Sequence, residues 1–276
     1  MENIWFTESH TEGYEVRWKI KDILHIEKSD YQSIAVLDTV EWGKALVLDG
    51  IVQITEADEY VYHEMIVHPS MFTHPQPNDV LIIGGGDGGT LREVAKHKEV
   101  QSVDMVEIDL KVIESSKKFF PSVSSSLDDP RLNLYVEDGV EFVKKPPRRY
   151  DVVIVDSSDP IGPATQLYSL EFYRNIGKAL KDDGILVVQS ESPIFYRDLF
   201  ASIVKNIHAV FANAYVYQAF VPTYVSGPWT FTMGSKRYNP CKLSSDIQML
   251  NGLKYYNESI HRAAFCLPEY IKNLIS

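Results

Sequence analysis

The chain has 276 residues, 45% of them hydrophobic, which is enough to bury one large core, or a large core and a small satellite domain. Its net charge of -11 disfavours nucleic acid and anionic membranes as partners, because both are bound through clustered Lys and Arg, and suits a cationic small molecule better. No stretch reaches the roughly 18 apolar residues of a membrane helix, and the N-terminus lacks signal-peptide features, so we expect a cytoplasmic protein.

The first fifth of the chain shows the pattern of a small antiparallel sheet. Apolar and polar positions alternate over residues 16–55. Within residues 45–54, Asp49 and Gly50 stand between two apolar arms, which predicts a two-residue hairpin turn. We therefore expect antiparallel strands over this region.

The pattern changes near residue 58. A helix is predicted from Asp58 to about Phe72, followed by short apolar runs with helix-like segments between them, as in parallel strands covered on both faces. These runs are 80–84, 103–109, 132–136, 151–156 and 185–190. Two later runs, 214–224 and 229–235, follow each other too closely for a crossover helix and should pair antiparallel. The predicted fold class is α/β: a doubly wound, mostly parallel sheet with a terminal antiparallel hairpin over 58–276, and a β-domain over 1–57.

A glycine-rich loop follows the first of the parallel strands. Its glycines are Gly84, Gly85, Gly86, Gly88 and Gly89. They fit the GxGxxG pattern between a strand and a helix, where glycine lets the backbone approach a nucleotide closely. Glu107, about 20 residues further on at the end of the next strand, is placed to accept hydrogen bonds from a ribose. A nucleotide or nucleoside is expected, with NAD and adenosylmethionine-type ligands both open; a turn that only packs helix on strand is the alternative.

Asp87 lies inside this loop and helps to choose the ligand. A dinucleotide pyrophosphate would meet its carboxylate, and two like charges at about 4 Å repel by roughly 4 kcal/mol at an intermediate dielectric. A cationic sulfonium nucleoside would be attracted instead. Asp87 could also act as the N-cap of the following helix, and the two roles can coexist.

Further carboxylates are expected at the same edge of the sheet. Asp138 and Gly139 follow the third strand, and Asp156 and Asp159 lie at the end of the fourth. Ligands of such sheets bind beyond the carboxyl ends of the strands, so these acids should face one cleft. Crowded carboxylates repel each other unless a cation lies among them.

An organic cation is favoured over a metal ion in this cleft. Oxygen ligands suit magnesium or calcium, but the spacing of the acids matches neither an EF-hand loop nor a P-loop. Cys241 and Cys266 lack the spacing of a zinc site or a disulfide framework. We therefore predict no metal site and two plain thiols.

With these residues in view, the sequence resembles the spermidine synthase family from about Trp5 to residue 270. The segments that carry the resemblance are LVLDGIVQITEADEYVYHEM, LIIGGGDGGTLREV, VDMVEID, DSSDPIGPA and YYNESIHRAAFCLPE. The resemblance implies an N-terminal β-domain, a C-terminal methyltransferase-like Rossmann domain, and association as homodimers or homotetramers. It also implies an enzyme that transfers the aminopropyl group of decarboxylated S-adenosylmethionine, used as a cosubstrate and not as a prosthetic group, to putrescine.

The resemblance further implies roles for single residues. It assigns the nucleoside of the donor to Gln32, Glu107, Asp138 and Gly139, with Glu107 on the ribose and Asp138 on the adenine amine. It assigns the terminal ammonium of the donor to Asp87, helped by Asp156. It assigns the acceptor to Tyr62, Asp156, Asp159 and Tyr224, with Gln189 nearby, and we add His63 and Asp87 to the expected acceptor contacts. His63 stands where many relatives have Gln.

Direct displacement is the predicted mechanism: a neutral amine of putrescine attacks the carbon attached to the sulfonium. Asp156, assisted by Tyr62, is the candidate to orient this amine and accept its proton. A diamine N-methyltransferase, a non-catalytic polyamine or nucleoside sensor and an NAD-dependent oxidoreductase are the competing functions. The sequence leaves open the preferred acceptor, dimer or tetramer, and the residues that hold the distal acceptor amine.

Overall fold

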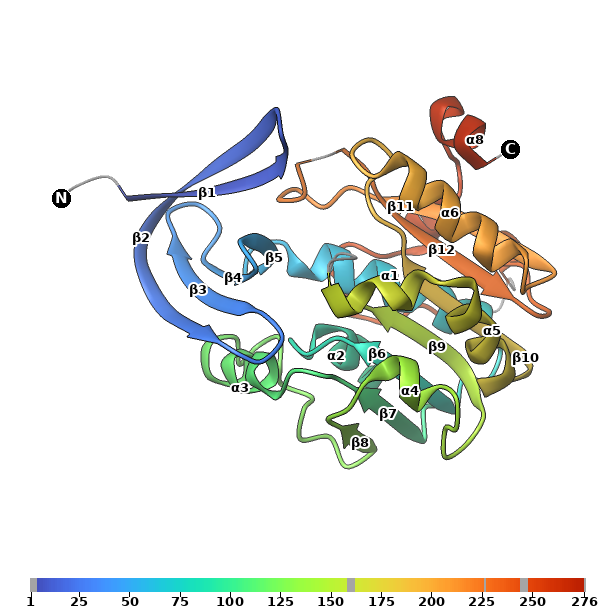
Figure 1. Ribbon diagram of the computed structural model, residues 1–276. Coiled ribbons are helices and arrows are strands. Elements are labelled where there is room, and N and C mark those ends of the chain that lie inside the picture. The colour runs from blue at the N-terminus through green and yellow to red at the C-terminus, as the bar shows by residue number, and fades with distance from the viewer. Residues whose placement is uncertain (1–3, 158–161, 226, 244–247, 276) are drawn as a thin grey trace.

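The computed structural model describes residues 4–157, 162–225, 227–243 and 248–275. Two sheets stand side by side, a smaller one at the N-terminal end and a larger one covered by helices (Figure 1). Within the described ranges, none of the helices has both the length and the apolar character that crossing a bilayer requires.

The N-terminal sheet is antiparallel throughout, with its five strands in chain order. The strands are β1 (Ile4–Thr11), β2 (Tyr14–Lys28), β3 (Ser33–Thr39), β4 (Lys44–Leu48) and β5 (Ile51–Thr55). Asp49 and Gly50 join β4 to β5 with φ angles of 48° and 85°, so both central residues of the turn are left-handed. This geometry matches the right-handed twist of the flanking strands, and the predicted hairpin is confirmed.

The larger sheet has the strand order β11-β12-β10-β9-β6-β7-β8. Its strands are β6 (Asp79–Gly84), β7 (Ser102–Val106), β8 (Leu132–Tyr135), β9 (Tyr150–Asp156), β10 (Leu180–Gln189), β11 (Asn213–Ala219) and β12 (Trp229–Ser235). The strands β6 to β10 pair in parallel, whereas β12 pairs antiparallel with β10 and with β11. The doubly wound sheet with a terminal antiparallel hairpin, predicted from the apolar runs, is confirmed.

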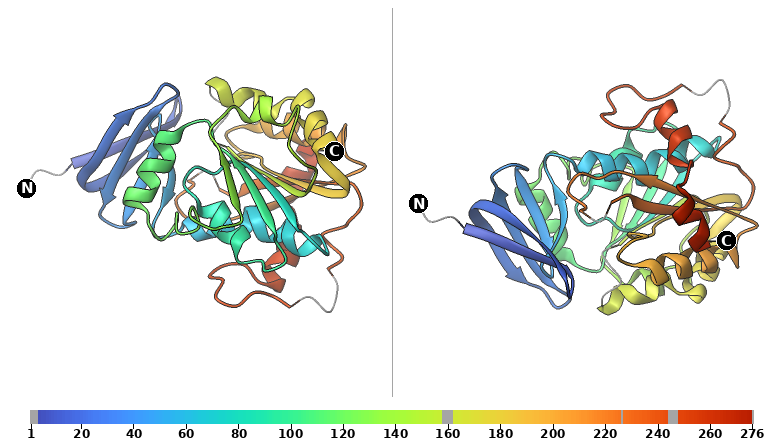
Figure 2. Two further views of the ribbon diagram at one scale, coloured as in Figure 1. Left: turned by 90° about the horizontal axis from the view of Figure 1, so that it is seen from below. Right: turned by 90° about the horizontal axis from the view of Figure 1, so that it is seen from above.

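Helices cover both faces of this sheet (Figure 2). They are α1 (Glu59–Thr73), α2 (Gly89–Ala95), α3 (Leu110–Phe119), α4 (Gly139–Phe142), the 3₁₀ helix η1 (Gly162–Tyr168), α5 (Leu170–Ala179), α6 (Arg197–His208), α7 (Glu258–Ala264) and α8 (Glu269–Ile275). Alternate residues of β6 point to opposite faces: Val80 and Ile82 pack with α1 and α2, and Leu81 and Ile83 with α4, α5 and α6. Both faces are therefore apolar, which explains the nearly continuous hydrophobic runs.

Helix α3 connects the two sheets. Val112 of α3 and Phe120 at its C-terminal end pack into one apolar cluster with Ile34, Val36 and Leu46 of the N-terminal sheet. Figure 2 shows α3 against this sheet in both views. The contact fixes the N-terminal sheet beside the carboxyl ends of the parallel strands.

Two predicted strands end at least three residues earlier than expected. The run 103–109 is a strand only to Val106, because Glu107 turns back to accept the backbone N–H of Asp109 at 2.9 Å. The run 214–224 is a strand only to Ala219. Beyond it, the N–H of Thr223 is bonded to Asp58 at 2.8 Å instead of to a neighbouring strand. Both differences arise near the carboxyl ends of the parallel strands, where the chain lines a cavity.

Candidate active site

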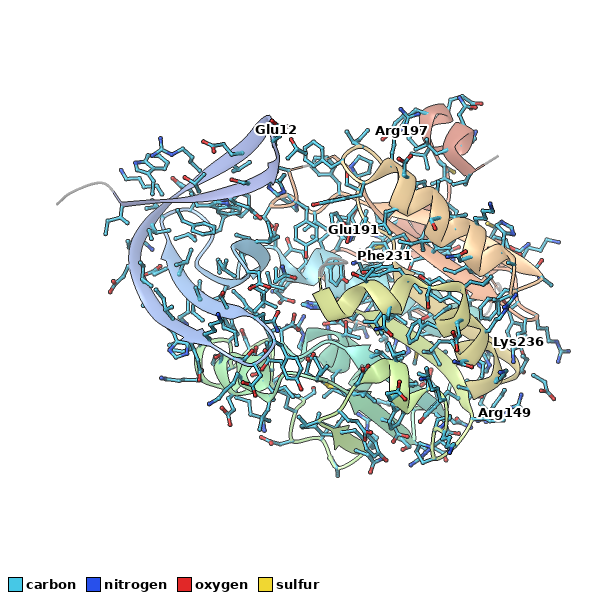
Figure 3. All side chains as sticks on the ribbon, viewed as in Figure 1. Glu12, Arg149, Glu191, Arg197, Phe231 and Lys236 are labelled. Carbon is cyan, nitrogen blue, oxygen red and sulfur yellow. The ribbon has the colours of Figure 1, made fainter. Side chains whose placement is uncertain are left out.

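A cavity lies between the N-terminal sheet and the carboxyl ends of the parallel strands. The strands β1, β4 and β5 contribute one wall, and the ends of β6, β7, β9 and β10 contribute the other. Figure 3 shows which ends of the strands face the N-terminal sheet: Glu191, just beyond the carboxyl end of β10, lies in the middle of the molecule, whereas Arg149 and Lys236 lie at the far edge. The cavity therefore lies where ligands of doubly wound sheets bind.

The glycine loop forms the floor of the cavity. Gly84, Gly85 and Gly86 line it, and Gly84 has a φ of 82° and no room for a Cβ against the backbone of Asp156. Gly88 and Gly89 face away from the cavity: a Cβ on Gly88 would meet Ser124 and Leu127, and a Cβ on Gly89 would overlap the ring of His63. The first part of the loop thus faces the cavity, and the second part packs against the segment after α3 and against helix α1.

Asp156 is held at the end of β9 by two hydroxyl groups. Tyr62 of α1 donates to Oδ1 at 2.7 Å, and Thr90 of α2 donates to Oδ2 at 2.6 Å. Burial, followed by the charge of Asp87, raises the pKa of Asp156 above its ordinary value. A carboxylate with a raised pKa and a fixed orientation is a better proton acceptor than an exposed one.

Asp87 lines the cavity and contacts the start of α2, but the predicted N-cap role is wrong, because the N-cap position is occupied by Gly88. Its Oδ1 accepts the backbone N–H of Gly89 at 2.6 Å at the start of α2, and its side chain lines the cavity. Burial works to raise the pKa of Asp87, but the neighbouring His63 and the amide of Gly89 outweigh it and lower the pKa. Asp87 is therefore a carboxylate anchored to the loop, with its charge directed into the cavity.

The four residues predicted for the nucleoside all line the cavity. They are Gln32, Glu107, Asp138 and Gly139. Burial raises the pKa of Glu107 to about 7, and the charges of Asp109 and Asp156 add to the effect. Gln32 donates to Asp109 at 2.9 Å, and Asp138 accepts the N–H of Val140 at 2.7 Å as the cap of α4. The four residues come from three segments of the chain, since Asp138 and Gly139 are adjacent, and all of them line the same cavity.

The residues predicted for the acceptor are only partly brought together. Gln189 and Tyr224 line the cavity; Gln189 donates to Tyr168 at 2.6 Å, and Tyr224 donates to the carbonyl of Gln53 at 2.6 Å. His63 is fully buried behind Asp87 and is not among the described lining residues. Asp159 lies outside the described residues.

Several lining residues carry no signal in the local sequence. Glu8 of β1 is buried, accepts from Trp18 at 2.8 Å and from the N–H of Val52 at 2.9 Å, and faces the cavity. Others in this group are His10, Phe195, Tyr196 and Trp229. These side chains reach the cavity only through the packing of the β1–β2 hairpin and the loops after β10 and β11. Thr90 is different, because its place directly after the glycine loop could have marked it.

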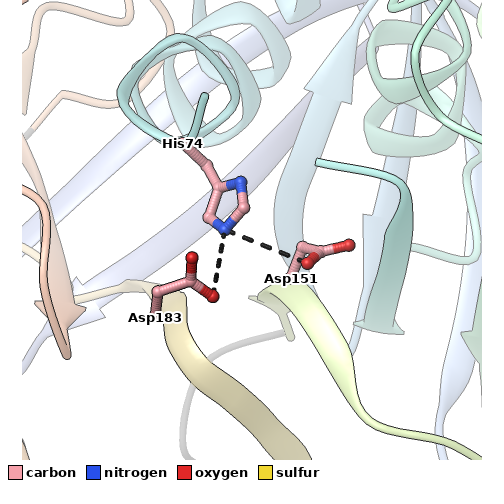
Figure 4. Close-up of side chains that lie close together, drawn as sticks. All are labelled: His74, Asp151 and Asp183. Atoms are coloured by element: carbon pink, nitrogen blue, oxygen red, sulfur yellow. Dashed lines mark ion pairs between the residues drawn. The ribbon is translucent and has the colours of Figure 1, made fainter. Parts of the chain in front are cut away.

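A group of potential metal ligands lies near the amino ends of β9 and β10, away from the cavity (Figure 4). His74 Nε2 is 3.9 Å from Asp151 Oδ1 and 3.8 Å from Asp183 Oδ1. The ammonium of Lys181 is bonded to Asp151 at 2.8 Å, so a cation is already present. Nδ1 of His74 accepts the N–H of Gln76 at 3.2 Å, which places the ring proton on Nε2. The group is thus an ion pair of Lys181 with Asp151 beside a neutral His74, whose pKa is lowered by burial.

Two family models match the chain. The spermine/spermidine synthase domain matches residues 59–245, and the spermidine synthase tetramerisation domain matches residues 4–56. The polyamine aminopropyltransferase of Desulforudis audaxviator is 47% identical over 269 residues, which are 98% of each chain. The polyamine aminopropyltransferase of Bacillus subtilis is 44% identical over 275 residues, which are 100% of each chain.

Two solved structures of spermidine synthases also match the whole chain. The spermidine synthase from Thermotoga maritima is 38% identical and matches with a TM-score of 0.93, covering 100% of this chain and 95% of the other. A spermidine synthase in complex with the transition-state analogue AdoDATO matches with the same TM-score of 0.93 at 38% identity, covering 100% of this chain and 96% of the other.

Proposed function

Because the chain belongs to the spermine/spermidine synthase family, we propose that it transfers the aminopropyl group of decarboxylated S-adenosylmethionine to putrescine, giving spermidine and methylthioadenosine. The protein is a transferase, and its nucleoside donor is a cosubstrate. The observation that carries the proposal is the placement of Asp87 and Asp156 on one cavity with the predicted nucleoside residues. Two carboxylates beside a nucleoside site suit a cationic donor and an amine acceptor.

The donor is proposed to lie across the ends of the parallel strands. Glu107 accepts from the ribose hydroxyls, Asp138 from the adenine amine, and Gln32 closes the nucleoside site from the N-terminal sheet. The terminal ammonium lies on Asp87. This arrangement is supported by the position of all four side chains on the cavity wall.

The reaction forms one N–C bond and breaks one C–S bond. The amine lone pair attacks the carbon next to the sulfonium, the C–S electron pair returns to sulfur, and the amine loses a proton. An alkylamine with a pKa of about 10 is protonated at neutral pH, so exposing the lone pair costs roughly 4 kcal/mol. Asp156 is proposed to orient the amine and accept the proton, because its pKa is raised and Tyr62 and Thr90 fix both of its oxygens.

The acceptor is proposed to extend from Asp156 toward Gln189 and Tyr224, which line the same cavity. His63 and Asp159 were also predicted to contact the acceptor, and for both this stays a prediction. His63 is the less favoured of the two, because Asp87 lies between its ring and the cavity.

We extend the proposal to the organisation of the protein. A boundary between residues 57 and 58 is supported by the separate family matches on either side of it. A homodimer or homotetramer is supported by the match of residues 4–56 to a tetramerisation domain. A cytoplasmic location is consistent with Cys241 and Cys266, which are both exposed, unpaired thiols.

A product assay tests the proposed function. The purified protein is incubated with decarboxylated S-adenosylmethionine and each of putrescine, cadaverine and spermidine, and methylthioadenosine and the polyamine product are quantified. Stoichiometric release of both with putrescine is expected. A parallel reaction with intact S-adenosylmethionine tests for a diamine N-methyltransferase, whose carboxylate-bearing cosubstrate Asp87 should repel. Methylated diamine from that reaction, without aminopropyl transfer, would contradict the proposal.

A further inference from the structure

Behind Asp87, charged side chains of three segments form a continuous chain. Arg92 of α2 contacts Glu59 of α1 with both terminal nitrogens, at 2.9 Å to Oε1 and 2.8 Å to Oε2. Glu59 Oε2 lies 2.6 Å from His63 Nδ1, and His63 Nε2 lies 3.3 Å from Asp87 Oδ1. Of these four residues only Asp87 lines the cavity, so the chain leads from helix α2 to the ligand space.

His63 is the cation in contact with Asp87. Nδ1 is hydrogen-bonded to Glu59, and Nε2 lies at ion-pair distance from Asp87 without forming a hydrogen bond. A carboxylate oxygen near each ring nitrogen favours a proton on both. Burial opposes the charge, but Asp87 and Glu59 outweigh it and raise the pKa of His63 well above its ordinary range. The other ionisable groups around the ring are the neighbouring Tyr62, Asp156, on which the charge of the ring also acts, and, through Glu59, Arg92.

The surroundings hold the ring and the carboxylate in one arrangement. His63 is fully buried, and Gly89 leaves the space that its ring occupies. The N–H of Gly89 and Nε2 of His63 both face Oδ1 of Asp87. Within the described part of the chain, no donor reaches Oδ2, so this second oxygen remains for a ligand.

The charge of His63 also offsets a conflict within the site. Asp87 and Asp156 line the same cavity, and the charge of Asp87 raises the pKa of Asp156. Two neighbouring carboxylates resist being ionised together. The charge of His63 lowers the pKa of both, which favours the state with two carboxylates.

We propose that His63, held by Glu59, is a positioning residue that keeps Asp87 ionised and oriented so that its Oδ2 binds the terminal ammonium of the donor. The inference rests on the proposed function, because it names the donor. His63 does not touch the substrate in this arrangement and acts only through Asp87. It therefore differs from the direct acceptor contact predicted for His63 from the sequence.

The test compares two ligands at several pH values. Dissociation constants for decarboxylated S-adenosylmethionine and for methylthioadenosine, which lacks the ammonium, are measured between pH 5.5 and 9 by calorimetry. The ratio of the two constants reports the sulfonium and the aminopropyl ammonium together, since both ligands share the ribose and hence any titration of Glu107; the variant Asp87→Asn identifies the part of the ratio that depends on Asp87. In the natural protein this ratio should change little over the range.

The variant His63→Gln keeps a polar side chain but removes the charge. An opposite charge within about 4–6 Å lowers the pKa of an Asp by about 1–3 units. Without the charge of His63, the pair of Asp87 and Asp156 should therefore take up a proton within the pH range of the experiment. We expect the preference for the charged ligand to fall at least about tenfold at pH 6 and to recover at pH 9. Asp87→Asn should lower the preference at every pH.

Controls separate this role from a structural one. His261→Gln removes another fully buried histidine, bonded to Tyr256 and Pro240 away from the cavity, and should leave the ratio unchanged. A pH-independent ratio in His63→Gln overturns the inference. If that variant does not fold, nitrogen NMR of the natural protein decides: an imidazolium at pH 7.5 supports the inference and a neutral ring overturns it. Absence of aminopropyl transfer by the natural protein would instead contradict the proposed function.

Discussion

At the scale of single residues, Asp156 combines a raised pKa with two fixed hydroxyl contacts. The variant Asp156→Asn keeps the shape of the side chain but cannot accept a proton. Because positioned acid–base groups contribute about 10²–10⁴-fold, we expect kcat to fall by about that factor. The dissociation constant of methylthioadenosine should change less than about threefold. The measurements are a steady-state assay and calorimetry, with the exposed Asp182→Asn as the control. Full turnover in Asp156→Asn would exclude the assigned role.

Glu107 makes the stability of the folded protein depend on pH. Its pKa in the folded protein is about 7, above the ordinary value of 4.5. Between these values the folded protein binds more protons than the unfolded chain, so Glu107 makes the free energy of unfolding fall as the pH rises through this window. The variant Glu107→Gln should remove this dependence. Relative to the natural protein, it should gain on the order of 2 kcal/mol between pH 5 and pH 8, measured by urea unfolding.

A substitution at the exposed Glu12 is the control, because it removes one negative charge without removing a buried group. Glu12→Gln alters the tip of the β1–β2 hairpin, far from the cavity floor (Figure 3). An equal gain in Glu12→Gln and Glu107→Gln would mean that the net charge, and not the burial of Glu107, sets the pH dependence.

At the scale of secondary-structure elements, helix α1 anchors the C-terminal segment as well as the site. Buried Glu64 accepts the backbone N–H groups of Lys254, Tyr255 and Tyr256 at 2.8, 2.8 and 2.7 Å. A buried donor left without a partner costs about 1–3 kcal/mol, and of these three residues only Tyr256 is buried. We expect Glu64→Ala to lower the free energy of unfolding by about 1–3 kcal/mol, measured with denaturant.

The matched control for this prediction is Glu258→Ala, which removes an exposed glutamate paired with Arg262 on α7. Exposed pairs contribute about 0–1 kcal/mol, so this variant should be nearly neutral. Faster amide exchange in residues 254–256 of Glu64→Ala is also expected. Equal destabilisation by the two variants would contradict the anchoring role of Glu64.

The elements themselves were predictable where one local signal dominated. Buried parallel strands have apolar runs, and the Asp49-Gly50 turn requires residues that tolerate a positive φ, so both could be found from the sequence. The strand ends at Val106 and Ala219 could not. They depend on Glu107 turning back on its own loop and on Asp58 capturing Thr223 from a distant segment.

The same distinction applies to the site. Acids at the ends of parallel strands could be predicted because the fold brings those ends to one edge. Glu8 and the pairing of His63 with Asp87 could not, because they depend on how a hairpin and a helix pack against that edge. The structure therefore adds the residues of the N-terminal sheet that line the cavity, and it adds the charged residues that lie behind Asp87.

At the scale of the whole molecule, the net charge of -11 acts on ligands before they reach the cavity. A strongly negative protein attracts cationic ligands through its long-range field, and salt weakens this attraction as the screening length falls from about 10 Å at 0.1 M to about 3 Å at 1 M. Decarboxylated S-adenosylmethionine carries positive charge, whereas methylthioadenosine is neutral. The two ligands should therefore respond differently to ionic strength.

We expect the affinity for decarboxylated S-adenosylmethionine to fall several-fold between 0.05 and 0.5 M KCl, and the affinity for methylthioadenosine to change little, because salt screens only the charged ligand. Calorimetry at fixed pH measures both. Salt weakens a contact that is shielded from solvent less than it weakens the long-range attraction. Asp87→Asn should therefore lower the affinity for the charged ligand at every salt concentration. The salt dependence that remains in this variant reports the field of the other acids. A salt dependence that vanishes in Asp87→Asn would show that one contact, and not the charge of the molecule, attracts the donor.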